Sequence, residues 1–369
     1  MVYPIIRPTL PDFSEVEADL RAIWSSGMLT TGRVVGELEA MVAGYCGVEH
    51  CVAMSSCTSG LVLTVKALGL SGEVILPSFT FAATGHALVW NGIEPVFVDC
   101  LPGTYNIDPE AARAAITPRT TGIVGVYVFG VPPELGALES LAAEHGLALM
   151  FDSAQALGAT WQGRRAGGFG RAEVFSMSPT KVITAAEGGL VTTNDGALAG
   201  ALRQMRDYGK SADGYEMAHI GLNARQSELH AAVGKACMRH AEAYIGHRLA
   251  MIARYQAALS GLPGVSFQHV GDDRTGSGNY MVMRVSGAEA RLSRDGLYEA
   301  LAERGIHTKK YFYPPLHLHA AYGAWRQKYE GRLPQTERLS QEGIAIPLYG
   351  HIAPEDCDII AAAIRDLLG

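Results

Sequence analysis

The sequence predicts an α/β protein: a mostly parallel central sheet with helices on both faces, followed by a smaller C-terminal α+β domain. Short, almost continuously apolar runs alternate with helical stretches, which is typical of parallel sheets buried on both faces. Near residue 240 a long amphipathic segment begins and this alternation changes. We therefore expect a large domain at residues 1–245, with about the first 15 residues packed on the small domain, which spans residues 246–369.

Local patterns place the individual elements. Asp108 and Pro109 suit the N-cap and first position of a helix, and glycine ends the helical stretches at 81–92 and 133–146. The expected strands are residues 51–54, 73–79, 94–100, 122–130, 147–152, 173–178, 188–195, 265–270, 279–286 and 305–313. The expected helices are residues 61–70, 81–92, 108–116, 133–146, 197–209, 239–264, 294–305 and 354–369.

Composition bounds the class of protein. The chain has 369 residues, of which 48% are hydrophobic and 18% charged, with a net charge of −7. Because the basic residues form no run, we expect no nucleic-acid partner. The N-terminal stretch lacks a signal-peptide pattern, and no apolar run is long enough to cross a membrane. Six cysteines without a CxxC pair indicate reduced thiols, so we expect a cytoplasmic protein with no metal site.

Polar residues follow the first predicted strand, at the carboxyl edge where open α/β sheets bind ligands. Ser56, Thr58, Ser59 and Gly60 open a helix there. Backbone N–H groups at a helix start, with hydroxyls beside them, suit a phosphate. The alternative is a serine-capped turn with no ligand.

Asp152 ends the predicted strand 147–152, and Gln155 lies three residues further on. A carboxylate at the end of an apolar strand is costly unless it meets a cation or a hydrogen-bond donor. A protonated ring nitrogen would be such a partner, and Gln155 could reach the same ligand. Alternatively, Asp152 caps the following loop and Gln155 is a surface amide.

Lys181 is the one basic residue of FSMSPTKVITAAEGG, residues 175–189, in which Glu187 is the only other charge. It follows a predicted strand end that also carries Ser176, a second candidate phosphate donor. Burial would disfavour the ammonium form and leave an amine able to act as nucleophile and base. Alternatively, Lys181 is a solvated surface lysine, and the Ser176 hydroxyl bonds to the backbone of its strand.

Together, a phosphate site, a carboxylate for a ring nitrogen and a reactive amine are what pyridoxal 5'-phosphate (PLP) requires of a protein. The lysine binds the cofactor aldehyde as a Schiff base, and the acid keeps the pyridine ring protonated. The sequence therefore predicts a PLP enzyme.

The sequence resembles the DegT/DnrJ/EryC1/StrS family of PLP-dependent sugar aminotransferases from about residue 5 to 365. The resemblance implies the fold-type-I architecture, which is like that of aspartate aminotransferase. The motifs that carry it are SSCTSGL (55–61), PSFTFAAT (77–84), PVFVDC with TYNIDPE (95–110), ITPRT (116–120), FDSAQALGATWQGRRAGGFG (151–170), FSMSPTK with EGG (175–189), GLNARQSELHAAVG (221–234), YPPLH (313–317) and IPLY (346–349).

The resemblance implies a role for each candidate residue. Lys181 would form the Schiff base and carry the proton between substrate and cofactor carbons, and Asp152 would pair with the pyridine nitrogen. The other implied cofactor contacts are Thr58, Ser59 and Ser176 at the phosphate, Phe81 on the ring face, Gln155 near the ring hydroxyl, and Asn223 reaching the phosphate from the neighbouring subunit of a homodimer. Without the resemblance, Phe81 is typical of a core residue and Asn223 of a turn.

Candidate substrate residues are Arg225, Lys309, Lys310, Tyr313 and His317, which could contact a nucleotide-sugar diphosphate or sugar hydroxyls. The alternative for YPPLH is a proline-fixed turn with basic residues on the surface. Many family members carry an aromatic residue or histidine in place of Ser178 and asparagine in place of Val182. Some relatives with histidine in place of the lysine are sugar dehydratases, and Lys181 argues against that activity here.

The implied reaction starts with glutamate or glutamine, which gives its amino group to PLP and leaves pyridoxamine 5'-phosphate (PMP). The PMP form then aminates a ketone, and TAAEGG (184–189) favours a dTDP-4-keto-6-deoxyhexose aminated at C4. Such a reaction belongs to amino-sugar biosynthesis for an antibiotic or polysaccharide. The alternatives are a 3-keto sugar, a keto-cyclitol without a nucleotide, a non-catalytic PLP- or sugar-phosphate-binding regulator, and a phosphate-binding scaffold with a solvated Lys181.

Overall fold

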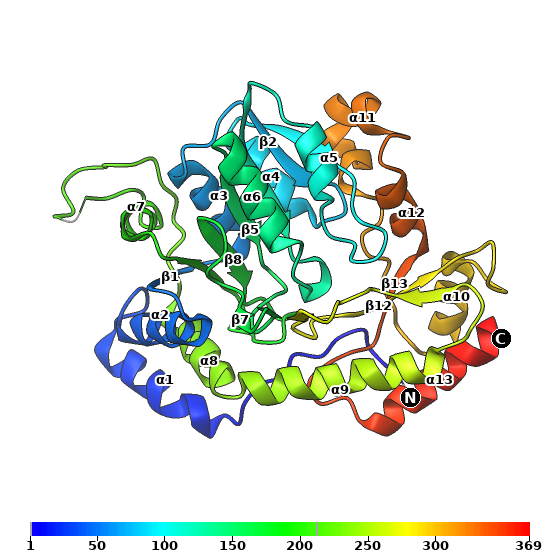
Figure 1. Ribbon diagram of the computed structural model, residues 1–369. Coiled ribbons are helices and arrows are strands. Elements are labelled where there is room, and N and C mark those ends of the chain that lie inside the picture. The colour runs from blue at the N-terminus through cyan, green and yellow to red at the C-terminus, as the bar shows by residue number, and fades with distance from the viewer. Residues whose placement is uncertain (1, 212) are drawn as a thin grey trace.

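The computed structural model describes residues 2–211 and 213–369 (Figure 1). Its central sheet has seven strands, of which β9 runs antiparallel to both neighbours while all other neighbours pair in parallel. The predicted mostly parallel α/β sheet is therefore confirmed. The strands in sheet order are β1 (His50–Met54), β9 (Gly189–Thr193), β8 (Ala172–Ser176), β5 (Ala148–Asp152), β4 (Thr120–Val126), β2 (Glu73–Pro77) and β3 (Glu94–Val98).

Helices cover both faces of this sheet, and each face has its own apolar core. Alternation along β1 shows the two sides: Cys51 and Ala53 belong to one buried cluster, and Val52 and Met54 to the other. The first cluster includes residues of α2 (Arg33–Cys46), α5 (Pro109–Ala114), α6 (Leu135–His145) and α8 (Glu228–Arg239), and the second includes residues of α3 (Cys57–Ala67), α4 (Ala82–Trp90) and α7 (Gly196–Met205).

A second, three-stranded sheet is antiparallel and has a separate core. It consists of β10 (Val265–Phe267), β12 (Met281–Val285) and β13 (Gly343–Ile346), packed with α9 (Ala241–Leu259), α10 (Arg294–Glu303) and α13 (Pro354–Leu368). Figure 1 shows α9 and α13 side by side. Tyr3 packs in this core, and its N–H donates to the Gly305 carbonyl at 2.8 Å. The predicted domain boundary after residue 245 falls inside the continuous helix α9, and the division stays a prediction.

One predicted strand is wrong. Residues 305–313 are irregular and make two isolated bridges, Tyr3 with Ile306 and Lys309 with Ala345. The peptide bonds Tyr311–Phe312 and Tyr313–Pro314 are cis. Two prolines follow, and because proline has no backbone N–H it cannot extend a ladder. The sequence patterns also missed α1 (Ser14–Ser26), α2, α8, β6 (Thr160–Trp161), β7 (Arg164–Arg165), β11 (Arg274–Thr275), α11 (Gly323–Tyr329), α12 (Pro334–Glu342) and β13.

The sequence also led to expectations about membrane-spanning segments and about the cysteines. Within residues 2–211 and 213–369, no helix combines the length and apolar character that crossing a membrane requires. The six cysteines are buried free thiols.

Candidate active site

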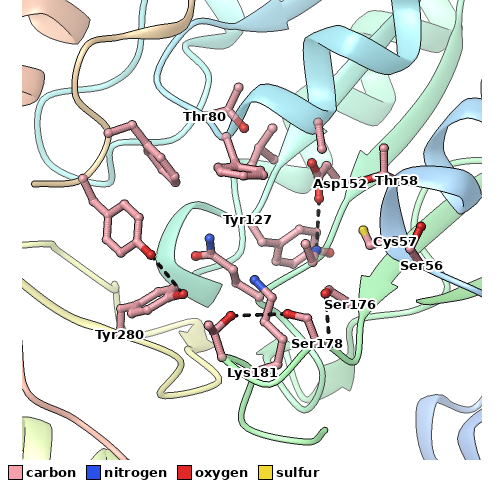
Figure 2. A pocket seen from close by; sticks show the side chains of 18 of the residues that line it. Ser56, Cys57, Thr58, Thr80, Tyr127, Asp152, Ser176, Ser178, Lys181 and Tyr280 are labelled. Carbon is pink, nitrogen blue, oxygen red and sulfur yellow. Dashed lines mark hydrogen bonds between the residues drawn. The ribbon is translucent and has the colours of Figure 1, made fainter. Parts of the chain in front are cut away.

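A cavity of about 290 Å³ opens at the carboxyl ends of β1, β5 and β8, where polar residues follow apolar strands (Figure 2). Residues 280, 309, 311 and 312, next to β12 or in the irregular segment before α11, close one side of it. Seven of the predicted site residues line this cavity: Thr58, Phe81, Asp152, Gln155, Ser176, Lys181 and Lys309.

Asp152 ends β5 with its carboxylate fixed by two donors. Thr84, from α4, donates its hydroxyl to Asp152 Oδ2 at 2.7 Å, and the Ala154 N–H donates to Oδ1 at 3.1 Å. Burial raises the pKa of Asp152, and the two donors and the positive charge of Lys181 act against that rise. The residue is only 5% exposed yet borders the cavity, so its charge is available to a buried ligand.

The amino end of α3 meets the same cavity. Ser56 caps the helix by accepting a hydrogen bond of 3.0 Å from the Ser59 N–H, and the Ser59 hydroxyl in turn accepts from the Ser56 N–H at 3.2 Å. The first amides of a helix have no intrahelical partner, so the N–H groups of Cys57 and Thr58, which the cap does not use, can bind an anion. The Ser59 hydroxyl, in contrast, is used in the cap, and Ser59 does not line this cavity.

Lys181 follows β8 on a turn in which its N–H donates to the Ser178 carbonyl at 3.1 Å. Its side chain points into the cavity between Ser178 and Tyr280 (Figure 2). The residue is half-buried rather than enclosed. No carboxylate of the described residues lies within 4.0 Å of its amine. The amine therefore lies at the cavity without an ion-pair partner among the described residues.

Tyr280 and Tyr311 form a wall that the sequence analysis missed. The Tyr311 hydroxyl donates to the Tyr280 hydroxyl at 3.4 Å, and the Lys309 amine lies 4.7 Å from the centre of the Tyr311 ring. Both tyrosines pack against a buried cluster that includes Phe129 and Phe312 and joins the two sheets. For Tyr311, the local signal was the aromatic and basic run KKYFY (309–313). That run does not say which of its side chains faces Lys181, which lies 130 residues before Tyr311 in the chain.

The charges at this wall shift both phenols. Burial alone would raise the pKa of Tyr280, but the positive charge of Lys181, the hydrogen bond from Tyr311 and the positive charge of Lys309 outweigh burial and lower it. Burial and the neighbouring Tyr280 raise the pKa of Tyr311. The positive charges of Lys181 and Lys309 therefore both act on the Tyr280 hydroxyl.

Two predicted residues lie on the segment before α8, outside this cavity. Asn223 is exposed and forms a bridge with Asp207. Arg225 makes an ion pair with the same aspartate. The role predicted for Asn223 belongs to a second subunit, so a single chain does not test it.

Three more predicted residues follow Lys309 and also lie outside the cavity lining. Lys310 makes an ion pair of 2.7 Å with Asp295. Tyr313 is 45% exposed and stacks against a guanidinium group of α10. His317 is fully buried, with its Nδ1 2.6 Å from the Ser78 hydroxyl, and burial lowers its pKa. His317 therefore lies outside the cavity lining in the single chain, and its predicted contact with a substrate stays a prediction.

The fold and the cavity together define a class. An unpaired amine, a buried carboxylate and a helix amino end meet at the carboxyl edge of a mostly parallel sheet, as an enzyme that transfers amino groups requires. Residues 12–365 match the model of the DegT/DnrJ/EryC1/StrS aminotransferase family, and the chain belongs to this family. The protein is therefore an aminotransferase.

Individual relatives can be aligned with this chain along nearly their whole length. The chain is 35% identical over 355 residues to the erythromycin biosynthesis sensory transduction protein EryC1 of Saccharopolyspora erythraea, covering 95% of each chain. It is 33% identical over 356 residues to the dTDP-3-amino-3,4,6-trideoxy-alpha-D-glucose transaminase of Streptomyces venezuelae, covering 96% of this chain and 92% of the relative. The crystal structure of DesI with its TDP-sugar product matches with a TM-score of 0.93 and 39% identity, covering 99% and 92% of the two chains.

Proposed function

We propose that this protein is a PLP-dependent aminotransferase that moves an amino group from glutamate or glutamine to the ketone of a nucleotide-linked deoxysugar. The observation that carries the proposal is that Lys181 and Asp152, from separate strand ends, border one cavity with the amino end of α3. That arrangement places an amine, a carboxylate and an anion site where a single cofactor can meet all three.

The residues present fit PLP. The Gln155 Oε1 atom is buried without a hydrogen-bond partner among the described residues, and it borders the cavity, so it is available to a ligand hydroxyl. Phe81 is 60% exposed at the cavity edge, where its ring can lie on a flat ligand. Bound PLP would supply an electron-withdrawing ring that stabilises negative charge on the reacting carbon.

The chain's own groups would have separate tasks. Asp152 would hold a proton at the ring nitrogen, because a fixed, buried carboxylate favours a positive partner. The amides of Cys57 and Thr58 and the Ser176 hydroxyl would bind the phosphate. Lys181 would hold the aldehyde and, once released from it, move a proton as a general base.

The substrate assignment rests on the relatives and on one sequence motif. The transaminase from S. venezuelae is named for a dTDP-3-amino sugar, and DesI was crystallised with a TDP-sugar product. Both names favour a nucleotide sugar for this chain. The TAAEGG motif favours amination at C4 of a dTDP-4-keto-6-deoxyhexose, and a 3-keto sugar or a keto-cyclitol is the alternative substrate.

We also propose a homodimer with shared sites. Trp90 and Ile220 are 80% and 78% exposed, and with Leu222 they line a second cavity of about 530 Å³ that shares Ser56 and Thr58 with the first. Ile220 and Leu222 lie on the segment that precedes α8. A second copy on this apolar surface would bring its own Asn223 beside the phosphate site.

The non-catalytic alternative has one point in its favour, the name sensory transduction protein carried by EryC1. A regulator that only bound a ligand would not need both a free amine and a fixed carboxylate in one cavity. The aminotransferase proposal accounts for both groups.

Purified enzyme loaded with PLP and supplied with glutamate tests the substrate proposal. A dTDP-4-keto-6-deoxyhexose and a dTDP-3-keto-6-deoxyhexose are offered separately, and mass spectrometry detects the amino sugar. We expect the 4-keto sugar to be converted and Lys181→Ala to be inactive with both. Conversion of the 3-keto sugar alone would overturn the C4 assignment, and conversion of neither would remove the nucleotide-sugar assignment.

A further inference from the structure

We propose that Lys309, Tyr280 and Tyr311 form a subsite for the α-carboxylate of the amino donor. This inference rests on the proposed function and deepens it, because it assigns the group that recognises the donor rather than the cofactor. All three side chains border the cavity that contains Lys181.

The Lys309 amine borders the cavity without a carboxylate partner among the described residues. Among residues 2–211 and 213–369, no carboxylate lies within 4.0 Å of its amine. The next residue, Lys310, is instead paired with Asp295 at 2.7 Å. Two backbone hydrogen bonds with Ala345 of β13, at 3.0 and 2.8 Å, fix the main chain of Lys309. The small sheet therefore carries one unpaired amine to the cavity at a defined position.

The two phenols supply directed donors beside this charge. Their hydroxyl oxygens are 3.4 Å apart, which is long for a hydrogen bond between them. One ligand oxygen can accept from both hydroxyls at about 2.7 Å, the usual length for such bonds. The positive charges of Lys181 and Lys309 both act to lower the pKa of Tyr280, so both amines lie close enough to this wall to attract an anion there.

Chemistry favours the α-carboxylate over the other anions of the reaction. That carboxylate is bonded directly to the carbon that carries the amino group, so it must lie near Lys181 during transfer. The diphosphate of a nucleotide sugar is attached at the anomeric carbon, several bonds from a keto group at C4. Glutamate and glutamine share the α-carboxylate, so one subsite would serve either donor.

Binding of glutarate, a dicarboxylate without an amino group, tests the subsite in the PLP-loaded enzyme. Calorimetry compares wild type with Lys309→Met, which keeps the length of the side chain and removes its charge. We expect glutarate to bind at least about tenfold more weakly to the variant, as for loss of a charge-assisted hydrogen bond. Lys309→Arg should recover part of the affinity, and dTDP should bind both proteins equally.

Matched controls separate charge at the cavity from charge elsewhere. Lys328→Met removes a lysine that is paired with Glu94 outside the cavity, and glutarate affinity should not change. Tyr311→Phe keeps the ring and should weaken glutarate severalfold. Glutaramide, the neutral diamide, should bind wild type and Lys309→Met alike.

Three results would overturn the inference: glutarate affinity unchanged in Lys309→Met, an equal loss of dTDP affinity, or no detectable glutarate binding by wild type. In kinetics, Lys309→Met should raise KM for glutamate and for glutamine. If the wild-type enzyme forms its PLP absorbance band but Lys309→Met changes nothing, only the subsite fails. If no such band forms, the proposed function fails.

Discussion

The Thr84 hydroxyl donates a hydrogen bond of 2.7 Å to Oδ2 of Asp152. Thr84 lies in the first turn of α4 and Asp152 at the end of β5, so a helix start fixes the carboxylate at the base of the cavity. The same threonine hydroxyl lies 2.8 Å from that of Thr80, which extends the network along the cavity wall. The position of the predicted cofactor acid is thus set by contacts between two elements.

Thr84→Val should weaken cofactor binding about tenfold or more while leaving the fold intact, as for loss of one hydrogen bond to a charged group. The pKa of Asp152 should rise, because the donor that lowers it is gone. Titration of the cofactor-free protein with PLP measures the affinity. Thr64→Val is the matched control, because the Thr64 hydroxyl is buried without a partner among the described residues. Equal affinities for the two variants would contradict the role of Thr84.

Glu173 should make the protein less stable as pH rises towards neutral. The carboxyl is buried on β8 and accepts from the Ser153 hydroxyl at 2.6 Å and from the Gly167 and Phe169 N–H groups, and burial raises its pKa to about 7. Since the unfolded pKa is about 4.3, the folded state holds an extra proton between these values. The stabilisation is therefore complete below about pH 4 and is lost as pH rises through 7.

Urea unfolding at a series of pH values measures this effect. Between pH 5 and 8 the wild type should lose on the order of 2–3 kcal/mol more than Glu173→Gln, whose amide cannot titrate. Parallel stability curves for the two proteins would show that Glu173 is ionised in the folded state throughout the range.

Lys181→Ala should raise the pKa of Tyr280, because the positive charge of Lys181 is the largest influence that lowers it against burial. Near-ultraviolet titration of phenolate in the cofactor-free protein follows the change, with Tyr280→Phe added to each background to identify the tyrosine. The variant should form less Tyr280 phenolate at a given alkaline pH. An unchanged titration would place the Lys181 amine too far from Tyr280 for the arrangement in Figure 2.

Shared active sites predict complementation between inactive subunits. Lys181→Ala lacks the amine and Asn223→Ala lacks the proposed partner contact, so each homodimer should be impaired. In a mixed dimer, the lysine of one subunit meets the intact Asn223 of the other, and one site is complete. Differently tagged, co-expressed subunits allow this dimer to be isolated and assayed. No activity beyond that of the Asn223→Ala homodimer would indicate that Asn223 acts within its own subunit or not at all.

The parts of the site that come from single strands could be predicted from sequence. Asp152 and Lys181 each follow an apolar run, and an acid or amine in that position is visible in a few residues. The same local signal gave most strands and helices of the large domain. It could not give the antiparallel direction of β9, because an apolar strand has the same pattern in either direction.

The parts that depend on packing between distant segments could not be predicted. Tyr280 and Tyr311 reach the cavity through the aromatic cluster that joins the sheets, and no local spacing encodes that contact. His317 resembled a substrate residue beside two prolines but is fully buried against Ser78. The Ser59 hydroxyl takes part in a reciprocal cap with Ser56 that the sequence did not show, and its predicted phosphate contact stays a prediction.

The absorbance spectrum of the purified protein, before and after adding glutamate, tests the central claim most directly. We predict a band at about 400–430 nm from PLP bound to Lys181, which glutamate shifts toward about 330 nm as the amino group is transferred. Lys181→Ala should lack both the band and its shift. If wild type shows no band even after incubation with PLP, Lys181 binds no aldehyde, and the proposed PLP-dependent mechanism is wrong.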